Sequence, residues 1–127
     1  MNYRVTLSNY KEDKYYPKVV CAVGEMLETS RTVKPVDVFQ RLGVLSEIRY
    51  KKWQSGQVRC LELGLECNLS KANRIMLIFG FHAHDLNMGK SHNFEKHKSK
   101  ILRFSKSGTK KIEELYARQF SVIGKKC

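Results

Sequence analysis

The sequence lacks an apolar stretch long enough to cross a lipid bilayer. The longest dense apolar run, Ile75 to Phe81, has seven residues and includes a glycine, whereas a membrane-spanning helix needs about 20. The first residues also lack the basic and then apolar layout of a secretory signal, since acidic residues occur as early as Glu12 and Asp13. We therefore expect no transmembrane helix, no membrane partner and a cytoplasmic location.

Cysteines are also few, and they are poorly spaced for chemistry. The four cysteines form no C-x-x-C pair and are too sparse for a disulfide scaffold, so we expect reduced thiols. The histidines match neither a zinc finger nor an H-E-x-x-H site. We expect surface or phosphate-contacting histidines and no metal or cofactor, with metal binding as the alternative for His82, His84, His92 and His97.

Signatures of catalysis are missing as well. Acidic residues are few, no glycine-rich phosphate loop precedes a helix, and no serine, cysteine or lysine nucleophile lies in a recognisable motif. We therefore expect a protein that is not an enzyme, with a nuclease as the alternative left open. The length of 127 residues suits a single domain, residues 1–127, with a modest core.

Positive charge is what the sequence has in excess. Lysine and arginine number 24 against 12 acidic residues, which gives a formal net charge of +12, and 42% of the residues are apolar, enough for a globular core. The surplus is uneven, with +5 in residues 1–60, −1 in residues 61–88 and +8 in residues 89–127. Such a balance indicates something about partners and little about the fold.

Two helices separated by a glycine-containing turn are expected over residues 35–56. Pro35 suits a first helical position, Gly43 supplies a stop, and Ser46 is a favourable N-cap for the second helix. This outline is that of a helix-turn-helix. It lies within a helical core that we expect over residues 17–86.

The rest of that core is an amphipathic helix from Pro17 and a long helix with one apolar seam, which Gly80 is expected to end or distort. The seam residues are three or four apart and are Val58, Leu61, Leu65, Leu69, Ala72, Met76 and Phe79. An N-terminal strand or arm is expected within residues 1–14. It is indicated by the period-two alternation of Tyr3, Val5 and Leu7.

Cations are densest in the C-terminal third. Residues 89–106 are expected to form a basic β-hairpin that turns at Lys98 and Ser99. A helix over residues 109–120 and a tail over residues 121–127 follow. The fold class we predict is α+β and mostly helical, with the helix-turn-helix and the basic hairpin in a winged-helix-like arrangement.

Three short motifs stand out between Pro35 and Phe120. They are W-x-x-G-x-V-x-x-L-E at residues 53–62, N-L-x-K at residues 68–71 and R-F-S-K-S-G at residues 103–108. In these motifs the chain resembles a family of small, uncharacterised bacterial proteins. The resemblance implies no activity, and the cysteines and histidines are not among the shared residues.

Nucleic-acid binding is the function that these patterns favour. Lysine and arginine contacts to phosphates release counterions and give affinity regardless of sequence, while polar side chains on a helix can reach base edges. The candidate contacts lie on the second helix of the helix-turn-helix and around the hairpin. They are Arg49, Lys51, Lys52, Gln54, Ser55, Lys90, Lys96, Lys98, Lys100, Arg103, Lys106, Lys110 and Lys111.

DNA and RNA are both compatible with this hypothesis. The alternative function is a protein-interaction module, a subunit or inhibitor of a nucleoprotein machine, because an acidic protein surface attracts the same lysines as a polyanion. The simplest explanations are an ordinary solvated face for the helix and a lysine-protected strand edge for the hairpin. Trp53 is expected to be a core aromatic residue, with base stacking as the alternative.

Overall fold

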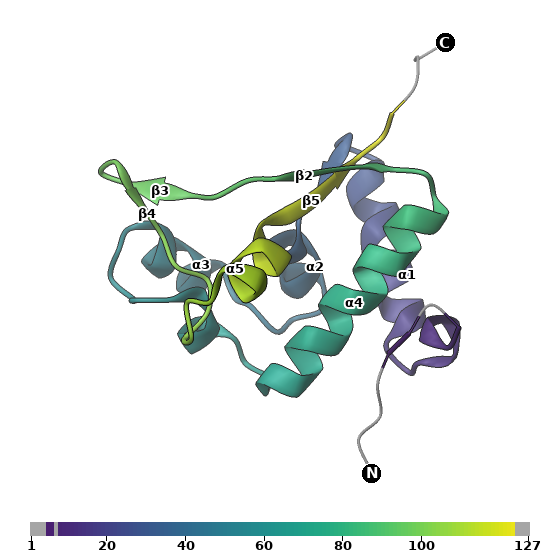
Figure 1. The fold of residues 1–127 in the computed structure, drawn as a ribbon, viewed down its shortest axis with the longest axis horizontal. Coiled ribbons are helices and arrows are strands. Elements are labelled where there is room, and N and C mark those ends of the chain that lie inside the picture. The colour runs from purple at the N-terminus through teal and green to yellow at the C-terminus, as the bar shows by residue number, and fades with distance from the viewer. Residues whose placement is uncertain (1–4, 7, 124–127) are drawn as a thin grey trace.

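Residues 5, 6 and 8–123 are described by a computed structural model, and they form an α+β fold (Figure 1). The helices of this part are α1 (Tyr16–Leu27), α2 (Pro35–Arg41), α3 (Glu47–Gln54), α4 (Leu69–Asp85) and α5 (Lys110–Ala117). Its strands are β1 (Thr32–Val33), β2 (Gly89–His92), β3 (Lys96–His97), β4 (Lys100–Ile101) and β5 (Arg118–Ser121). The predicted α+β class is confirmed.

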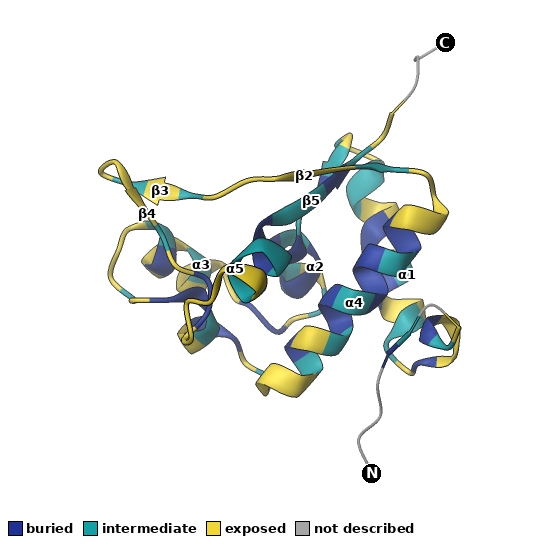
Figure 2. Ribbon diagram, in the orientation of Figure 1, coloured by how far each residue is buried: buried dark blue, intermediate teal, exposed yellow. Residues whose placement is uncertain are grey.

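β5 is the central strand of a three-stranded antiparallel sheet. It pairs with β1 on one side and with β2 on the other, so that Val33 and Lys90 both lie opposite Phe120. α4 packs on the sheet, where the rings of Phe79 and Phe120 meet with centroids 5.1 Å apart. The buried residues of α1, α2, α4 and β5 belong to one hydrophobic core, whereas the β3–β4 hairpin is largely exposed (Figure 2).

The first helices begin and end where their capping residues predict. The Asp37 carboxylate accepts a hydrogen bond from the backbone N–H that precedes α2, at 3.0 Å. The chain then turns at Gly43, whose φ of +76° favours glycine, and the Ser46 hydroxyl caps α3 by accepting a backbone N–H at 3.2 Å. The two helices predicted within residues 35–56 are confirmed.

The long helix predicted from residue 58 is wrong in its first half. Residues 58–68 contain only a short 3-10 turn, Leu61–Gly64, and α4 begins at Leu69. Two backbone N–H groups of this turn donate to the carbonyl oxygens of Arg103 and Phe104, at 3.1 and 2.9 Å. This non-local pairing replaces the hydrogen bonds that a helix would have formed.

α4 also begins and ends at residues that its apolar pattern does not indicate. The Asn68 side chain accepts a hydrogen bond from the Lys71 backbone N–H at 2.7 Å and so caps a new helix. At Gly80, where the sequence predicts an end or a distortion, the helix continues to Asp85. A glycine is required there for a different reason, because a Cβ would clash with the guanidinium of Arg118.

The predicted hairpin and the predicted last helix are both shortened by strand pairing. Residues 89–92 form β2 and pair with β5, so only β3 and β4 make the hairpin, with Lys98 and Ser99 at its turn as predicted. The helix predicted over residues 109–120 ends at Ala117, because the next residues pair as the central strand β5. Strand β1 has no counterpart in the sequence prediction.

The predicted strand and tail at the two ends lie partly outside the described residues. This holds for Tyr3, Leu7 and residues 124–127. Val5 is buried but does not belong to a strand, and the first regular element after it is the 3-10 turn Tyr10–Glu12.

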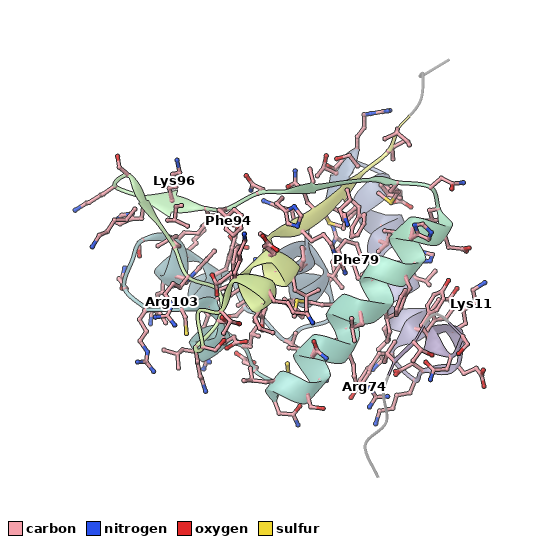
Figure 3. All side chains as sticks on the ribbon, viewed as in Figure 1. Lys11, Arg74, Phe79, Phe94, Lys96 and Arg103 are labelled. Atoms are coloured by element: carbon pink, nitrogen blue, oxygen red, sulfur yellow. The ribbon has the colours of Figure 1, made fainter. Side chains whose placement is uncertain are left out.

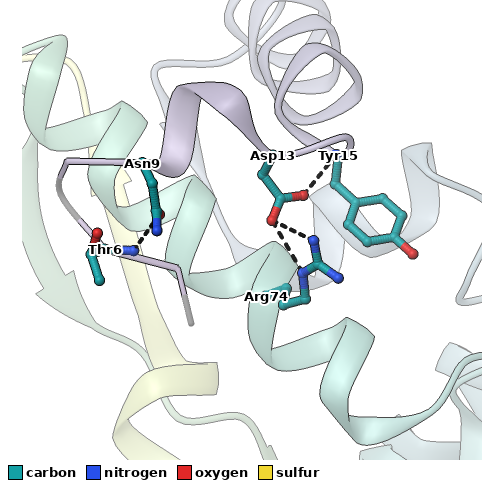
Figure 4. Close-up of polar contacts among 5 residues, drawn as sticks. All are labelled: Thr6, Asn9, Asp13, Tyr15 and Arg74. Atoms are coloured by element: carbon teal, nitrogen blue, oxygen red, sulfur yellow. Dashed lines mark hydrogen bonds and ion pairs between the residues drawn. The ribbon is translucent and has the colours of Figure 1, made fainter. Parts of the chain in front are cut away.

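A buried ion pair fixes the N-terminal segment to α4 (Figure 4). One carboxylate oxygen of Asp13 accepts hydrogen bonds from Nε and Nη2 of Arg74, at 3.1 and 2.7 Å, and the other accepts from the Tyr15 backbone N–H at 2.9 Å. The Asp13 side chain is fully buried, and that of Arg74 is 24% exposed. Both oxygens of this buried carboxylate are therefore satisfied.

Asp13→Asn is expected to lower the free energy of unfolding by about 2–3 kcal/mol, because it leaves a mostly buried guanidinium without its charged partner. Urea unfolding followed by circular dichroism measures the loss. Glu25→Gln is the matched control, since the Glu25–Arg41 ion pair is 49% and 44% exposed and exposed pairs contribute about 0–1 kcal/mol. Equal losses in the two variants would contradict the role of the buried pair.

Candidate nucleic-acid interface

The β3–β4 hairpin lies at one end of the molecule beside α3 (Figure 1). Glu95, which precedes β3, accepts hydrogen bonds from the Tyr50 hydroxyl at 2.8 Å and the Gln54 amide at 3.0 Å, both on α3. The His97 ring lies against Gly56 after α3, where a Cβ would be 3.0 Å from the ring Cδ2. These contacts hold the base of the hairpin against α3 and bring the two predicted basic segments together.

The tip of the hairpin has an unusual backbone. Lys98 has a φ of +51° and Ser99 a φ of +69°, the pattern of a two-residue turn that normally contains asparagine and glycine. A lysine in this left-handed region costs about 1–2 kcal/mol. A cation is therefore present at the tip despite a backbone that favours glycine.

Carboxylates hold the chain after the hairpin in one conformation. Glu113 of α5 accepts hydrogen bonds from the backbone N–H and the hydroxyl of Ser105, at 2.7 and 2.6 Å. Glu62 accepts from the Lys106 backbone N–H at 2.6 Å and from the Tyr116 hydroxyl at 2.7 Å. The two acidic residues therefore anchor the backbone of this loop.

The tyrosines in these networks remain hydrogen-bond donors. Burial, followed by the hydrogen bond to Glu95, raises the pKa of Tyr50 well above its ordinary value. Burial, followed by the hydrogen bond to Glu62, raises the pKa of Tyr116 in the same way. Both hydroxyls thus keep their proton at physiological pH and stabilise the fold around the hairpin.

The motif residues of the family resemblance have structural roles in this region. Trp53 is 1% exposed, as predicted for a core residue, and its indole N–H donates to the Arg103 carbonyl oxygen at 2.7 Å. The Arg103 guanidinium donates to the carbonyl oxygens of Ser105 and Lys106, at 3.2 and 2.6 Å. Gly108 leaves room for it, since a Cβ there would be 2.7 Å from Nη2. These residues build a scaffold for the loop.

Residues 96–111, the basic segment, contain seven cations and no acidic residue. Six of the cations are exposed lysines that form no ion pair within 4.0 Å with any described carboxylate. They are Lys96, Lys98, Lys100, Lys106, Lys110 and Lys111. The last two open α5, whose N-terminal end adds a partial positive charge.

Figure 3 places this basic segment in the molecule. Lys96 of the hairpin, Phe94 at its base and Arg103 in the following loop lie toward one end, and Lys11 and Arg74 lie toward the other. The cations of the second group have partners, since Lys11 pairs with a carboxylate at 4.0 Å and Arg74 with one at 2.7 Å. The lysines without ion pairs therefore gather at the end formed by the hairpin.

The predicted cationic contacts on α3 are partly neutralised within the protein. Arg49 forms an ion pair with Glu66 at 3.3 Å, and Lys51 forms one with Glu47, one helical turn earlier, at 3.8 Å. Lys52 is exposed and has no ion pair with a described residue. Lys52 is thus the α3 cation most available to a ligand.

The predicted polar contacts on α3 also have partners within the protein. The Gln54 amide donates to Glu95 at 3.0 Å, and the Ser55 hydroxyl donates to the Lys52 carbonyl oxygen at 3.0 Å. Lys90, predicted as part of the hairpin, lies on β2 of the three-stranded sheet instead. The structure therefore separates Lys90 from the basic segment and leaves few groups on α3 for reading bases.

The four histidines are distributed over three elements. His82 and His84 lie on α4, His92 on β2 and His97 on β3, and no group of three metal-ligating side chains occurs among the described residues. His82 is buried, edge-on to Tyr16 with ring centroids 6.0 Å apart, and its Nδ1 has no hydrogen-bond partner there. Burial lowers the pKa of His82, so the folded protein holds it neutral.

Protein stability is expected to fall as the pH drops below 6.5, the ordinary pKa of histidine. The unfolded chain takes up a proton on His82 there, whereas the buried ring does so only at a lower pH, so the unfolded state gains from acid first. Urea unfolding above and below this pH measures the loss. His82→Leu is expected to remove it, and His92→Gln on the exposed strand to retain it. A slope that persists in His82→Leu would contradict this assignment.

Comparisons with protein-family models, with curated proteins and with solved structures found no match. None of the helices in residues 5, 6 and 8–123 is both long and apolar enough to span a membrane. The chemistry of the site must therefore be inferred from its own geometry and charge.

Proposed function

We propose that this protein binds nucleic acid, DNA or RNA, chiefly through phosphate contacts made by the basic segment. The observation that carries the proposal is the group of six exposed lysines without ion pairs to the described residues. Like charges this close together repel one another, and a bound polyanion removes that repulsion. Each phosphate that a lysine contacts also releases counterions, which favours binding without dependence on sequence.

The rigidity of the basic segment supports the same proposal. Glu95, Glu62 and Glu113 fix the backbone on both sides of the hairpin, so little conformational entropy is lost when a ligand binds. The left-handed conformation of Lys98 has an explanation if its ammonium group contacts phosphate, because strained residues often persist at binding sites.

The arrangement of elements supports a winged-helix-like domain. α2 and α3 form the helix-turn-helix, and the β3–β4 hairpin is attached to α3 through Glu95. In helix-turn-helix proteins the second helix enters the major groove, and a neighbouring basic hairpin would then lie along the phosphate backbone. Because Arg49 and Gln54 are engaged within the protein, we expect attachment to phosphates to dominate over base readout.

A second candidate is binding to an acidic protein. Two aliphatic side chains beside the lysines favour it, since Ile48 on α3 is 69% exposed and Ile101 on β4 is 61% exposed. Such side chains contribute little to phosphate contacts but are common in protein interfaces. In this case the protein would be a subunit or inhibitor of a nucleoprotein machine.

Fluorescence-anisotropy titrations with duplex DNA, single-stranded DNA and structured RNA, at two ionic strengths, test the proposal. We expect binding to at least one of them at low salt, with log K falling linearly as log salt concentration rises. Polyglutamate serves as the acidic-protein comparison. No binding to any nucleic acid at low salt, or tighter binding to polyglutamate, would reject the proposal and favour the second candidate.

A further inference from the structure

A cavity of about 380 Å³ lies between the C-terminal half of α4 and the sheet. In Figure 1 this half of α4 is at the end of the molecule opposite the β3–β4 hairpin. Its lining combines apolar side chains, among them Phe81 and Met88, with the three basic side chains of His84, Lys90 and Arg118, and it includes no carboxylate. The cavity is thus both apolar and cationic.

Arg118 is the least satisfied of these groups. Its guanidinium lies under Gly80 of α4, where a Cβ would clash with Nη2, and its Cζ is 5.3 Å from the centroid of the Phe120 ring. Burial lowers the pKa of Arg118. No described residue gives the guanidinium a hydrogen bond or an ion pair, although it carries five N–H donors in a planar fork. Such a group is suited to a carboxylate or phosphate.

The sheet register places the second cation beside the first. Lys90 of β2 lies opposite Phe120 of β5, and Arg118 is two residues before Phe120, so all three side chains are on one face of the sheet. α4 packs on this face and contributes His84, one turn after Gly80. The neighbouring Asp85 lies 4.0 Å from Lys11 instead and does not line the cavity.

We propose that this cavity binds a small organic anion. Its carboxylate or phosphate group contacts Arg118 and Lys90, and its apolar or aromatic body lies among Phe81, Met88 and Phe120. The size is appropriate, because sites for small molecules occupy about 300–1,000 Å³ and combine apolar walls with a few polar groups. None of the six lysines of the basic segment lines the cavity, so this site is independent of the proposed nucleic-acid interface.

Phenyl phosphate and benzoate are suitable probes, with inorganic phosphate and benzyl alcohol as probes of the anionic group and the body alone. In two-dimensional ¹H–¹⁵N NMR of the full chain, we expect saturable shifts of the amides around Gly80, Lys90 and Arg118 with an aromatic anion. Arg118→Gln is expected to weaken this binding at least about tenfold, the usual effect of losing a charge-assisted pair. Affinity for nucleic acid is expected to stay unchanged in this variant.

Gly80→Ala tests the same site without changing any charge. The new Cβ displaces the Arg118 guanidinium, a flexible group, so the chain should still fold while binding of the aromatic anion is lost. Gly24→Ala in α1 is the matched control, because it has the same gain in helix propensity and open space around the new Cβ. The control is expected to bind like the wild type.

Three results would overturn this proposal. They are the absence of saturable shifts with both aromatic anions, equal affinity of Gly80→Ala and wild type, and a loss of nucleic-acid binding in Arg118→Gln, which would assign the cavity to the nucleic-acid interface. Failure of the nucleic-acid titrations alone would leave the anion site standing, because the two sites share no residue.

Discussion

Trp53→Ala is expected to lower the free energy of unfolding by about 3–5 kcal/mol, the usual effect of truncating a fully buried aromatic side chain. The Trp53 ring has its centroid 5.0 Å from that of Phe104 and 6.0 Å from that of Tyr50. Its indole N–H donates to Arg103. The substitution therefore removes the contact between α3 and the loop after the hairpin, as well as core volume.

Trp53→Phe separates these two contributions. It keeps an aromatic ring in the core but removes the N–H donor and leaves the Arg103 carbonyl oxygen without it, so we expect a smaller loss of about 1–2 kcal/mol. Thermal and urea unfolding followed by circular dichroism measure both variants. A Trp53→Ala protein as stable as the wild type would contradict the buried position of this side chain.

The double substitution Lys98→Glu/Lys100→Glu is expected to weaken nucleic-acid binding at least about tenfold, because two phosphate contacts become repulsive. Thermal stability should be unchanged, since both side chains are exposed and have no ion pair in the described structure. Anisotropy titrations and melting curves measure the two effects. Unchanged affinity would remove the hairpin from the interface.

Lys14→Glu/Lys18→Glu is the matched control for net charge. Both lysines are exposed, and α1 lies at the other end of the molecule from the hairpin (Figure 1). The same change in net charge should therefore lower affinity much less than the hairpin substitution does. A third variant, Lys98→Gly, removes one cation and relieves the left-handed backbone, so it should bind more weakly and unfold at a higher temperature.

Helix ends could be predicted because their signals are local. Ser46 accepts a backbone N–H three residues later, and Gly43 adopts its positive φ within a single turn. The long helix from Val58 was wrong because its apolar spacing is shared by a buried irregular segment. Pairing with the loop at Arg103 and a fresh cap at Asn68 decided the outcome, and only the second of these has a sequence signal.

Strands and their partners were harder to predict than helices. β5 follows α5 directly, and its four residues become a strand only because β1 and β2 lie on either side. No pattern within Arg118–Ser121 identifies those partners. For the same reason Lys90 could be assigned to the wrong hairpin, since register depends on contacts between distant residues.

The candidate site was predictable in its charges and not in its internal partners. The lysines of the basic segment can be counted in the sequence. That Glu95 binds α3 while Glu113 binds the following loop depends on tertiary structure. The orientation of Arg118 toward Gly80 depends on it too, because helix and strand come together only in the folded chain.

The dependence of log K on log salt concentration, compared between wild type and Lys98→Glu/Lys100→Glu, tests the central claim most directly. On the nucleic acid that the wild type binds best, each phosphate contact adds a slope of about −0.7 to −0.9. The wild-type slope is therefore expected to be steeper than that of the variant by about 2. Identical slopes, or a wild-type affinity that salt does not change, would contradict phosphate binding by the basic segment.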